Sequence, residues 1–271
     1  MKRVRTSVIV AFYNKIDYLR LVLASLECQS FSDFEVIVAD DGSRENVVEE
    51  LRQLVEASPL RIHHVWHEDR GWRKNEIMNA AVRRSQSDYL IVVDGDCVCH
   101  SRFVEEHWNN RQSQVCLTGR RVNLSASLTA QITPQNVKGG FLEKSLTLLI
   151  KDGLFGKTTD VERAPYIPAG WLRKWLNRKP KGLLGCNYSI YKADLMAING
   201  FDERYRSTAW GEDSDVQFRL ELIGVRIQTL INAAVQYHLY HKPLERPSEG
   251  ARLFAEVQAT RQAYTPYGIN Q

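Results

Sequence analysis

Residues 89–97, YLIVVDGDC, join a run of five apolar residues to two aspartates that are separated by one glycine. The apolar run predicts a buried strand, because a strand covered on both faces shows no polar alternation. Asp94 and Asp96 therefore stand where a core strand ends. Two carboxylates at the rim of a core require an explanation from the rest of the chain.

Strand-and-helix units precede this segment along the chain. Apolar runs predict buried strands over residues 7–12, 35–39 and 61–66. The helices that follow them are expected to begin near residue 14 or 15, and to cover about 45–57 and about 75–85. This alternation predicts an α/β fold in which a mostly parallel central sheet carries helices on both faces.

Polar residues follow three of these strands. They are Tyr13 and Asn14, Asp40 and Asp41, and Asp94 and Asp96. In sheets of this kind the ligand crevice lies beyond the carboxyl ends of the strands. A solvated turn explains any one of these strand ends, but three that converge on one edge favour a ligand site.

The second half of the chain is less regular. Residues 115–124 indicate a strand pair or one long strand, and residues 125–182 show no clean period. A regular pattern of apolar residues resumes at Gly185. A helix is predicted from about Glu212, and it is expected to end at Gly224 because glycine commonly ends helices. No repeat, low-complexity tract or linker divides the chain.

The composition is that of a globular protein and gives no argument for a nucleic-acid partner. The 271 residues include 36 Lys and Arg against 32 Asp and Glu, a net charge of only +4. The five cysteines form no CxxC pair, so we expect reduced thiols and a cytoplasmic location. The apolar stretch near the start is too short for a signal or a membrane span.

Asp94, Gly95 and Asp96 suit a site that holds a divalent cation. Carboxylate oxygens are ligands that Mg²⁺ and Mn²⁺ accept, and these ions often bridge carboxylates to substrate phosphates. Gly95 would let a substrate approach the backbone closely. For a lone pair of aspartates, a solvated turn is the usual explanation.

A second acidic cluster stands at the predicted start of a helix. It consists of Glu212, Asp213 and Asp215, preceded by Trp210 and Gly211. Acids in a first turn commonly complement the helix dipole, but packing alone does not explain a Trp-Gly pair directly before them. His238, in the segment YHLYH (237–241), could complete a metal site, although a single histidine is more often structural.

Residues 171–181, WLRKWLNRKPK, carry two tryptophans and five basic residues without an acid. Three interpretations remain open at this point. The segment could be a solvated loop, a lid that closes over a bound ligand, or a patch that meets an anionic membrane.

The order and spacing of these motifs resemble family 2 glycosyltransferases with the GT-A (Rossmann-like) fold. The N-terminal resemblance rests on SVIVAFYN (7–14), EVIVADDGS (35–43), GWRKNEIMN (71–79) and YLIVVDGDC (89–97). Residues 185–220, with GCNYSIY and WGEDSDVQFRL, and then YHLYH, resemble the subgroup of bacterial chondroitin-type polymerases and lipopolysaccharide or capsule glycosyltransferases. That half is also similar to the C-terminal region of galactosyltransferases.

The resemblance implies a metal-dependent, inverting hexosyltransferase. Such an enzyme moves a sugar from a UDP-sugar donor to a hydroxyl of a glycan acceptor, free or lipid-linked, in bacterial surface polysaccharide or lipopolysaccharide. It further implies one domain over 1–271, with a nucleotide-sugar-binding half (1–122) and an acceptor-binding, catalytic half (123–271). A peripheral position at the inner face of the membrane would then involve 171–181.

The family motifs also imply a donor site and a metal site. The donor-binding residues would be Phe12, Tyr13, Asn14, Asp40, Asp41, Arg73, Asn79, Asp94, Gly95 and Arg121. Tyr13 would stack on the uracil, Asp41 would accept a hydrogen bond from its ring nitrogen, and Arg121 would reach the diphosphate. Asp96 and His238 would hold Mn²⁺ or Mg²⁺.

On the acceptor side, the resemblance makes Asp213 the catalytic base. Glu212 would help to hold the acceptor, together with Trp210, Gly211 and Asp215. A helix N-terminus lowers the pKa of a carboxylate, so we expect Asp213 to be ionised but weakened as a base.

Three other functions are compatible with a sheet of this kind. An NAD(P)-dependent oxidoreductase needs a glycine-rich G-x-G-x-x-G turn, whereas the first strand runs into Phe12, Tyr13 and Asn14. A sugar-nucleotide pyrophosphorylase needs a basic glycine-rich loop at the same place. The alternative that remains is a non-catalytic carbohydrate- or nucleotide-binding protein of the same fold, which would not need both acidic clusters.

Overall fold

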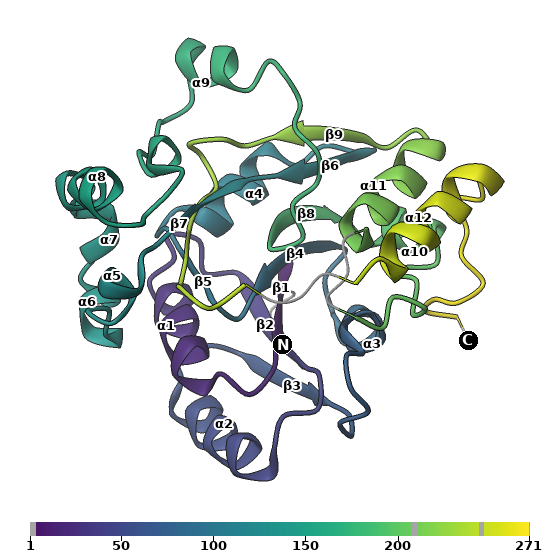
Figure 1. Cartoon of the computed structure of the whole chain (residues 1–271), viewed down its shortest axis with the longest axis horizontal. Coiled ribbons are helices and arrows are strands. Elements are labelled where there is room, and N and C mark those ends of the chain that lie inside the picture. The colour runs from purple at the N-terminus through teal and green to yellow at the C-terminus, as the bar shows by residue number, and fades with distance from the viewer. Residues whose placement is uncertain (1–3, 208–210, 244–246, 271) are drawn as a thin grey trace.

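A seven-stranded sheet forms the centre of the protein, described here from a computed structural model of residues 4–207, 211–243 and 247–270 (Figure 1). In order across the sheet, its strands are β3 (Ile62–Trp66), β2 (Phe34–Asp40), β1 (Thr6–Phe12), β4 (Tyr89–Asp94), β8 (Asn187–Tyr191), β6 (Val115–Thr118) and β9 (Arg226–Thr229). Strand β8 runs antiparallel to β4 and β6, and the other neighbouring pairs are parallel. The mostly parallel sheet predicted from the sequence is confirmed.

Helices cover both faces of this sheet, as predicted. On one face lie α1 (Ile16–Glu27), α2 (Glu45–Ala57) and α4 (Phe103–Asn110), and on the other lie α3 (Lys74–Arg84), α10 (Lys192–Ala197) and α11 (Glu212–Leu222). Successive strand residues point to opposite faces, so Val8 packs with the first group of helices and Ile9 with the second. Burial of each such side chain contributes about 1.5–3 kcal/mol.

A smaller, three-stranded sheet stands beside the large one. Its order is β5 (Cys97–Cys99), β10 (Val235–His238) and β7 (Arg120–Asn123). Four short helices from the segment without a clean period cover it: α5 (Ala126–Thr129), α6 (Pro134–Lys138), α7 (Phe141–Lys144) and α8 (Leu146–Phe155). Val98 and Tyr237 of this sheet pack against Leu128 and Leu149 of these helices.

The chain crosses between the two sheets at glycines. Residues 115–124 form neither a hairpin nor one strand, because β6 belongs to the large sheet and β7 to the small one, with Gly119 between them. A Cβ on Gly119 would lie 2.2 Å from Asn187 Oδ1. A Cβ on Gly95 would lie 2.9 Å from the Ala11 carbonyl oxygen, which accepts the Gly95 N–H at 2.7 Å. The glycine that we expected to admit a substrate therefore admits the backbone of β1.

The remaining elements are a 3₁₀ helix (Val161–Arg163), α9 (Trp171–Leu176) and α12 (Glu249–Thr260). Figure 1 shows α9 at the opposite end of the molecule from α2, and the chain then returns past α11 to β8. All five cysteines are free thiols. Within the ranges described, no helix has both the length and the apolar character needed to cross a bilayer.

Candidate active site

The two carboxylates of the DGD segment adjoin different sheets and face different partners. Asp94 ends β4 in the large sheet, and its Oδ1 lies 3.3 Å from the Nζ of Lys74 on α3. Asp96 precedes β5 in the small sheet and faces two histidines. The crossover at Gly95 thus divides one short motif between two clusters.

Asp96, His238 and His241 form the first cluster. One ligand atom from each residue lies within 4.8 Å of the others. The Nε2 of His238 is 3.6 Å from Asp96 Oδ1, and the Nε2 of His241 is 3.3 Å from Asp96 Oδ2. The antiparallel pairing of His238 with Cys97 and the 2.9 Å hydrogen bond from the Leu239 N–H to the Asp96 carbonyl bring these residues together.

His241 was not identified as a ligand from the sequence. Its Nδ1 lies 2.8 Å from the Lys242 carbonyl oxygen, and because a carbonyl only accepts, this nitrogen carries a proton. The same bond fixes the ring with Nε2 toward Asp96, as in many metal sites. The available signal was the three-residue spacing of the two histidines in YHLYH.

The electrostatics of this cluster favour an anionic Asp96. Burial alone would raise the pKa of Asp96, but the hydrogen bonds and charges of His238 and His241 outweigh burial and hold that pKa well below its usual range. The hydrogen bond to Asp96 also raises the pKa of His241. A carboxylate with two imidazoles suits a divalent transition ion, and it suits Mn²⁺ better than Mg²⁺, which prefers an all-oxygen shell.

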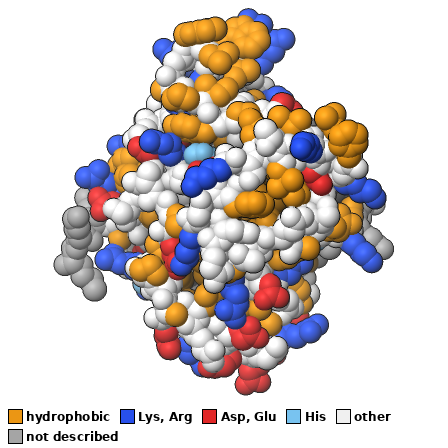
Figure 2. All heavy atoms as spheres, turned by 90° about the vertical axis from the view of Figure 1, so that its left-hand side faces the viewer, with side chains coloured by type: hydrophobic (Ala, Val, Ile, Leu, Met, Phe, Trp, Pro, Cys, Tyr) orange, Lys and Arg blue, Asp and Glu red, His pale blue; other side chains and the backbone are white. Residues whose placement is uncertain are grey.

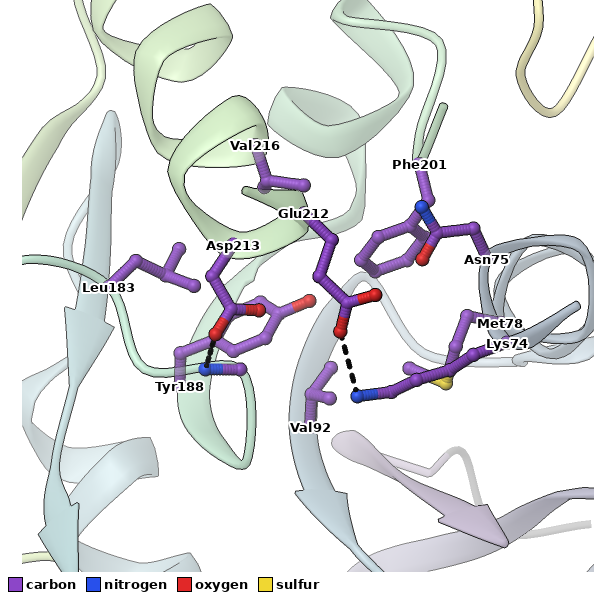
Figure 3. Close-up of a pocket in the computed structure, with 11 residues that line it drawn as sticks. Lys74, Asn75, Met78, Val92, Leu183, Tyr188, Phe201, Glu212, Asp213 and Val216 are labelled. Atoms are coloured by element: carbon purple, nitrogen blue, oxygen red, sulfur yellow. Dashed lines mark hydrogen bonds and ion pairs between the residues drawn. The ribbon is translucent and has the colours of Figure 1, made fainter. Parts of the chain in front are cut away.

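The second cluster lines a pocket between α3, β4, β8 and α11 (Figure 3). Lys74 Nζ lies 3.1 Å from Glu212 Oε1, as well as near Asp94. Burial alone would lower the pKa of Lys74, but the charges of Asp94, Glu212 and Asp213 outweigh it and raise that pKa well above its usual value. Lys74 lies inside the motif GWRKNEIMN but was not identified from the sequence.

Asp213 faces this pocket from the first turn of α11. Its Oδ2 accepts the backbone N–H of Gly185 at 2.8 Å. Burial, followed by the charge of Glu212, raises the pKa of Asp213 to about 6, although Lys74 and the Gly185 N–H act in the opposite direction. The lowered pKa predicted from the helix N-terminus is therefore wrong, because burial outweighs the helix dipole here.

Two polar atoms in the same pocket have no hydrogen-bond partner among the described residues. They are the hydroxyl of Tyr188 and the Oε2 of Glu212. Figure 3 shows the Tyr188 hydroxyl directed toward the space between the carboxylates of Asp213 and Glu212. Buried polar atoms are normally paired, so these two are free to bind a group that enters the pocket.

Beyond the carboxyl ends of β1 and β2, hydrogen bonds link the residues that follow the two strands. Asn14 adopts a left-handed conformation (φ 56°), its N–H donates to Ser43 Oγ, and its Oδ1 accepts the Arg44 N–H. Asp41 accepts the backbone N–H of Arg73 at 3.0 Å. These bonds bring three of the expected donor residues into one region.

Tyr13 and Phe12 at the end of β1 differ in exposure. The ring of Tyr13 is exposed, and its hydroxyl donates to Asp69 Oδ2 at 3.0 Å. Phe12 is buried in the core beneath it. A base can therefore stack on Tyr13, while Phe12 supports the turn.

Three expected site residues are enclosed in the protein instead. Asp40 accepts from the Ser43 N–H and lies 2.9 Å from His64 Nε2. Asn79 binds the loop at Phe201, and Asp215 forms an ion pair with Arg219. Each is fully buried, so the direct donor or acceptor contact implied by the resemblance is not open to them, and they support loops around the site.

The remaining expected residues are placed as follows. Arg121 lies 3.3 Å from the Cys186 sulfur, and although burial alone would lower its pKa, the nearby Cys186, Cys97 and Asp94 raise it. Gly211 caps α11 with a φ of 129°. Trp210 lies outside the described residues.

Residues 7–153, which contain the β1 to β5 framework and Asp96, match the family described as glycosyl transferase family 2. The chain belongs to this family. Residues 175–242 of this family 2 glycosyltransferase also match the family described as the N-terminal domain of galactosyltransferase. The chain thus combines a family 2 match over its first half with a galactosyltransferase-like C-terminal region.

The transferase is distantly homologous to bacterial chondroitin synthases. It is 26% identical to the Escherichia coli chondroitin synthase over 240 residues, which cover 86% of this chain and 34% of that protein. The Pasteurella multocida chondroitin synthase is 24% identical over 251 residues, covering 88% of this chain and 25% of the relative. The chain thus spans about a third of the first relative and a quarter of the second.

Solved structures show the same GT-A fold. The S. aureus TarS fragment in complex with UDP-GlcNAc superposes with a TM-score of 0.59 and 18% identity, covering 94% of this chain and 65% of that one. The mannosyltransferase PcManGT from Pyrobaculum calidifontis, in complex with GDP-Man and Mn²⁺, superposes with a TM-score of 0.57 and 18% identity. That alignment covers 96% of this chain and 62% of PcManGT.

Proposed function

We propose that this transferase moves a sugar from a UDP-sugar to a glycan hydroxyl, with inversion and with the help of Mn²⁺. The observation that carries the proposal is the division of the DGD segment, which places a metal-type cluster and a base-type cluster on the two sides of one turn. A leaving diphosphate and an attacking hydroxyl need such groups on opposite sides of the sugar carbon. We also propose a single domain with the halves 1–122 and 123–271, in which each cluster draws residues from both halves.

Asp96, His238 and His241 would hold the metal. When bound, a divalent cation neutralises the charge that develops on the leaving diphosphate. The mixed nitrogen and oxygen ligands favour Mn²⁺, and PcManGT, which shares the fold, was solved with Mn²⁺. Arg121 is placed to add a fixed positive charge near Asp94.

Tyr13 and Asp41 would bind the nucleotide base. The exposed ring of Tyr13 offers a stacking surface. The carboxylate of Asp41 is buried and already bound by the Arg73 N–H and by His67 Nε2, so it would use a remaining lone pair to accept a hydrogen bond from the base. UDP is the nucleotide we propose, because the family resemblance implies it and TarS, which shares the fold, was solved with UDP-GlcNAc.

Asp213 would accept the proton of the attacking hydroxyl. Its pKa of about 6 leaves it mostly ionised at pH 7 and closer to the operating pH than an ordinary aspartate, which improves a general base. Glu212 Oε1 is held by Lys74, whereas its Oε2 has no hydrogen-bond partner within the described ranges and would bind an acceptor hydroxyl. The homology to chondroitin synthases supports a polysaccharide hydroxyl as the acceptor.

Calorimetric titration with UDP, in the presence and in the absence of Mn²⁺, tests the proposal. We expect Mn²⁺-dependent binding that Asp96→Ala abolishes. Asp88→Ala, just before the other end of β4, is the matched control and should bind UDP like the natural protein. UDP binding that is unchanged without Mn²⁺ and unchanged in Asp96→Ala would overturn the proposed metal site. The absence of any UDP binding would overturn the choice of nucleotide.

A further inference from the structure

Helix α9 presents its apolar side to solvent and an ionic side to the protein. Arg173 points inward, where Nη1 lies 2.7 Å from Glu106 Oε2 on α4, and the two side chains are only 11% and 9% exposed. Trp171 and Trp175 share the opposite side of the helix and are 79% and 55% exposed. A surface helix in water normally has the reverse arrangement, so a partner less polar than water is expected to cover this side.

Helix α8 adds a second exposed apolar surface to the same part of the chain. Leu149 packs into the core, whereas Ile150 and Leu154, four residues apart, are exposed. Leu154 and Phe155 are 72% and 89% exposed, which is unusual for side chains of this size. We call the exposed residues Trp171, Leu172 and Trp175 of α9 the outer apolar surface, and the exposed residues of α8 are Ile150, Leu154 and Phe155.

The charge around this surface is strongly positive. Residues 150–181 contain eight Lys and Arg and three Asp and Glu, a net charge of +5, whereas the whole chain has a net charge of +4. The rest of the chain is therefore slightly negative. Figure 2 shows hydrophobic side chains gathered with Lys and Arg at the top of the molecule, where Figure 1 places α9.

We propose that the outer apolar surface and its lysines dock onto an anionic lipid bilayer. Tryptophan prefers the interface between lipid and water, and lysine beside it pairs with anionic headgroups. Arg178 stacks over the Trp175 ring at 5.5 Å and carries positive charge to the same level. The proposal goes beyond the transferase activity, because lipid binding needs neither donor nor metal.

The segment that follows α9 connects the outer apolar surface to the proposed active site. From α9 the chain is fixed by the side chain of Asn177, which donates to the Ile231 carbonyl, and by Gln217, which accepts the Leu183 N–H. Two residues later, Gly185 donates to Asp213. When α9 is docked, this segment therefore holds Asp213 at a fixed distance from the bilayer. An acceptor that is attached to a lipid would require such a fixed distance.

The Arg173–Glu106 ion pair distinguishes this proposal from the lid interpretation of residues 171–181. Arg173 Nη2 also lies 3.4 Å from Asn110 Oδ1, so α9 is attached to α4 at two points. A lid would have to break a nearly buried ion pair at each closure. A fixed surface needs no such movement.

Vesicle co-sedimentation tests the proposal directly. We expect the protein to sediment with vesicles of phosphatidylcholine and phosphatidylglycerol, to bind pure phosphatidylcholine much less, and to lose binding as salt rises. The double variant Trp171→Ala, Trp175→Ala should weaken binding at least about tenfold. Tyr264→Ala removes an aromatic ring that is about as exposed as Trp175 but lies far along the chain, and this variant should bind like the natural protein.

A second pair of variants tests the charge. Lys174→Glu with Lys179→Glu should abolish the preference for anionic vesicles, whereas Arg52→Glu on α2, at the other end of the molecule, should leave it intact. Thermal unfolding and UDP titration of each variant show whether the fold and donor site are kept. Because vesicle binding is measured without donor or acceptor, its failure would leave the transferase proposal untouched.

Two results would overturn the proposal. One is the absence of binding to anionic vesicles, or binding that the tryptophan and lysine variants do not change. The other is a concentration-dependent dimer in sedimentation velocity that the tryptophan variant dissociates, which would identify a second copy of the chain as the occupant.

Discussion

The backbone N–H of Gly185 donates a 2.8 Å hydrogen bond to Asp213 Oδ2, at a position where a side chain would collide with that carboxylate. A Cβ on Gly185 would lie 2.1 Å from Asp213 Oδ1. The proposed base, Asp213, is therefore held by position 185, which must be glycine. The two positions are 28 residues apart in the sequence.

Gly185→Ala should displace the Asp213 carboxylate and lower turnover by about 100-fold, since small misplacements of a catalytic group have effects of this size. UDP binding, measured by calorimetry, should be retained. Gly182→Ala is the matched control, because its Cβ would meet only the flexible side chain of Gln217 at 3.2 Å. Equal loss of turnover in both variants would contradict a specific role for the Gly185–Asp213 contact.

The rate of transfer should depend on the ionisation of Asp213. A base must be deprotonated to accept a proton, so kcat/KM should rise with pH through about 6 and then level off. Asp213→Asn should lower turnover by about 10²–10⁴-fold and remove this limb, while UDP binding remains. A pH–rate profile that is unchanged in Asp213→Asn would exclude this residue as the base.

Lys74→Met should move the acidic limb of that profile to higher pH. The Lys74 charge lowers the pKa of Asp213. Without that charge, burial and the charge of Glu212 raise the pKa of Asp213 further. Lys74→Arg keeps the charge and should restore most of the original profile. Lys192→Met, which removes a lysine bound to the Ser85 carbonyl away from the pocket, should leave the limb where it is.

Tyr188→Phe should affect substrate use rather than stability. The hydroxyl has no partner among the described residues, so its removal should change the free energy of unfolding by less than about 1 kcal/mol. If a sugar hydroxyl binds it during transfer, kcat/KM should fall about three- to tenfold. Tyr205→Phe removes another buried hydroxyl that has no partner in the described part of the chain, lies outside the pocket, and should leave kcat/KM unchanged.

His241→Ala should weaken Mn²⁺ binding by at least about 10–100-fold, because a ligand and its fixed hydrogen bond are lost together. Calorimetry with Mn²⁺ alone, and then with UDP, measures the effect. His63→Ala on the edge strand β3 serves as the control histidine. Unchanged Mn²⁺ affinity in His241→Ala would leave Asp96 and His238 as the only protein ligands of the proposed site.

The sequence alone determined the framework of the fold. Apolar runs of strand length, separated by helical periods, require a parallel sheet buried on both faces, and carboxyl ends of parallel strands meet at one edge. Polar residues after those runs therefore had to gather at that edge. The positions of Asp94 and Asp96 followed from this local pattern, as did the extent of α2 over residues 45–57.

Only the tertiary structure decided what each polar residue does. Asp40 and Asp41 are adjacent in the sequence and both are buried, yet they have different partners. Asp40 binds Ser43 and His64, whereas Asp41 binds His67 and the backbone of Arg73. His241 joins Asp96 because β10 pairs with β5, a contact between segments about 140 residues apart. Burial by distant elements also reversed the expected pKa shift of Asp213. Such outcomes depend on which segments pack together, and the local pattern of residues does not encode that packing.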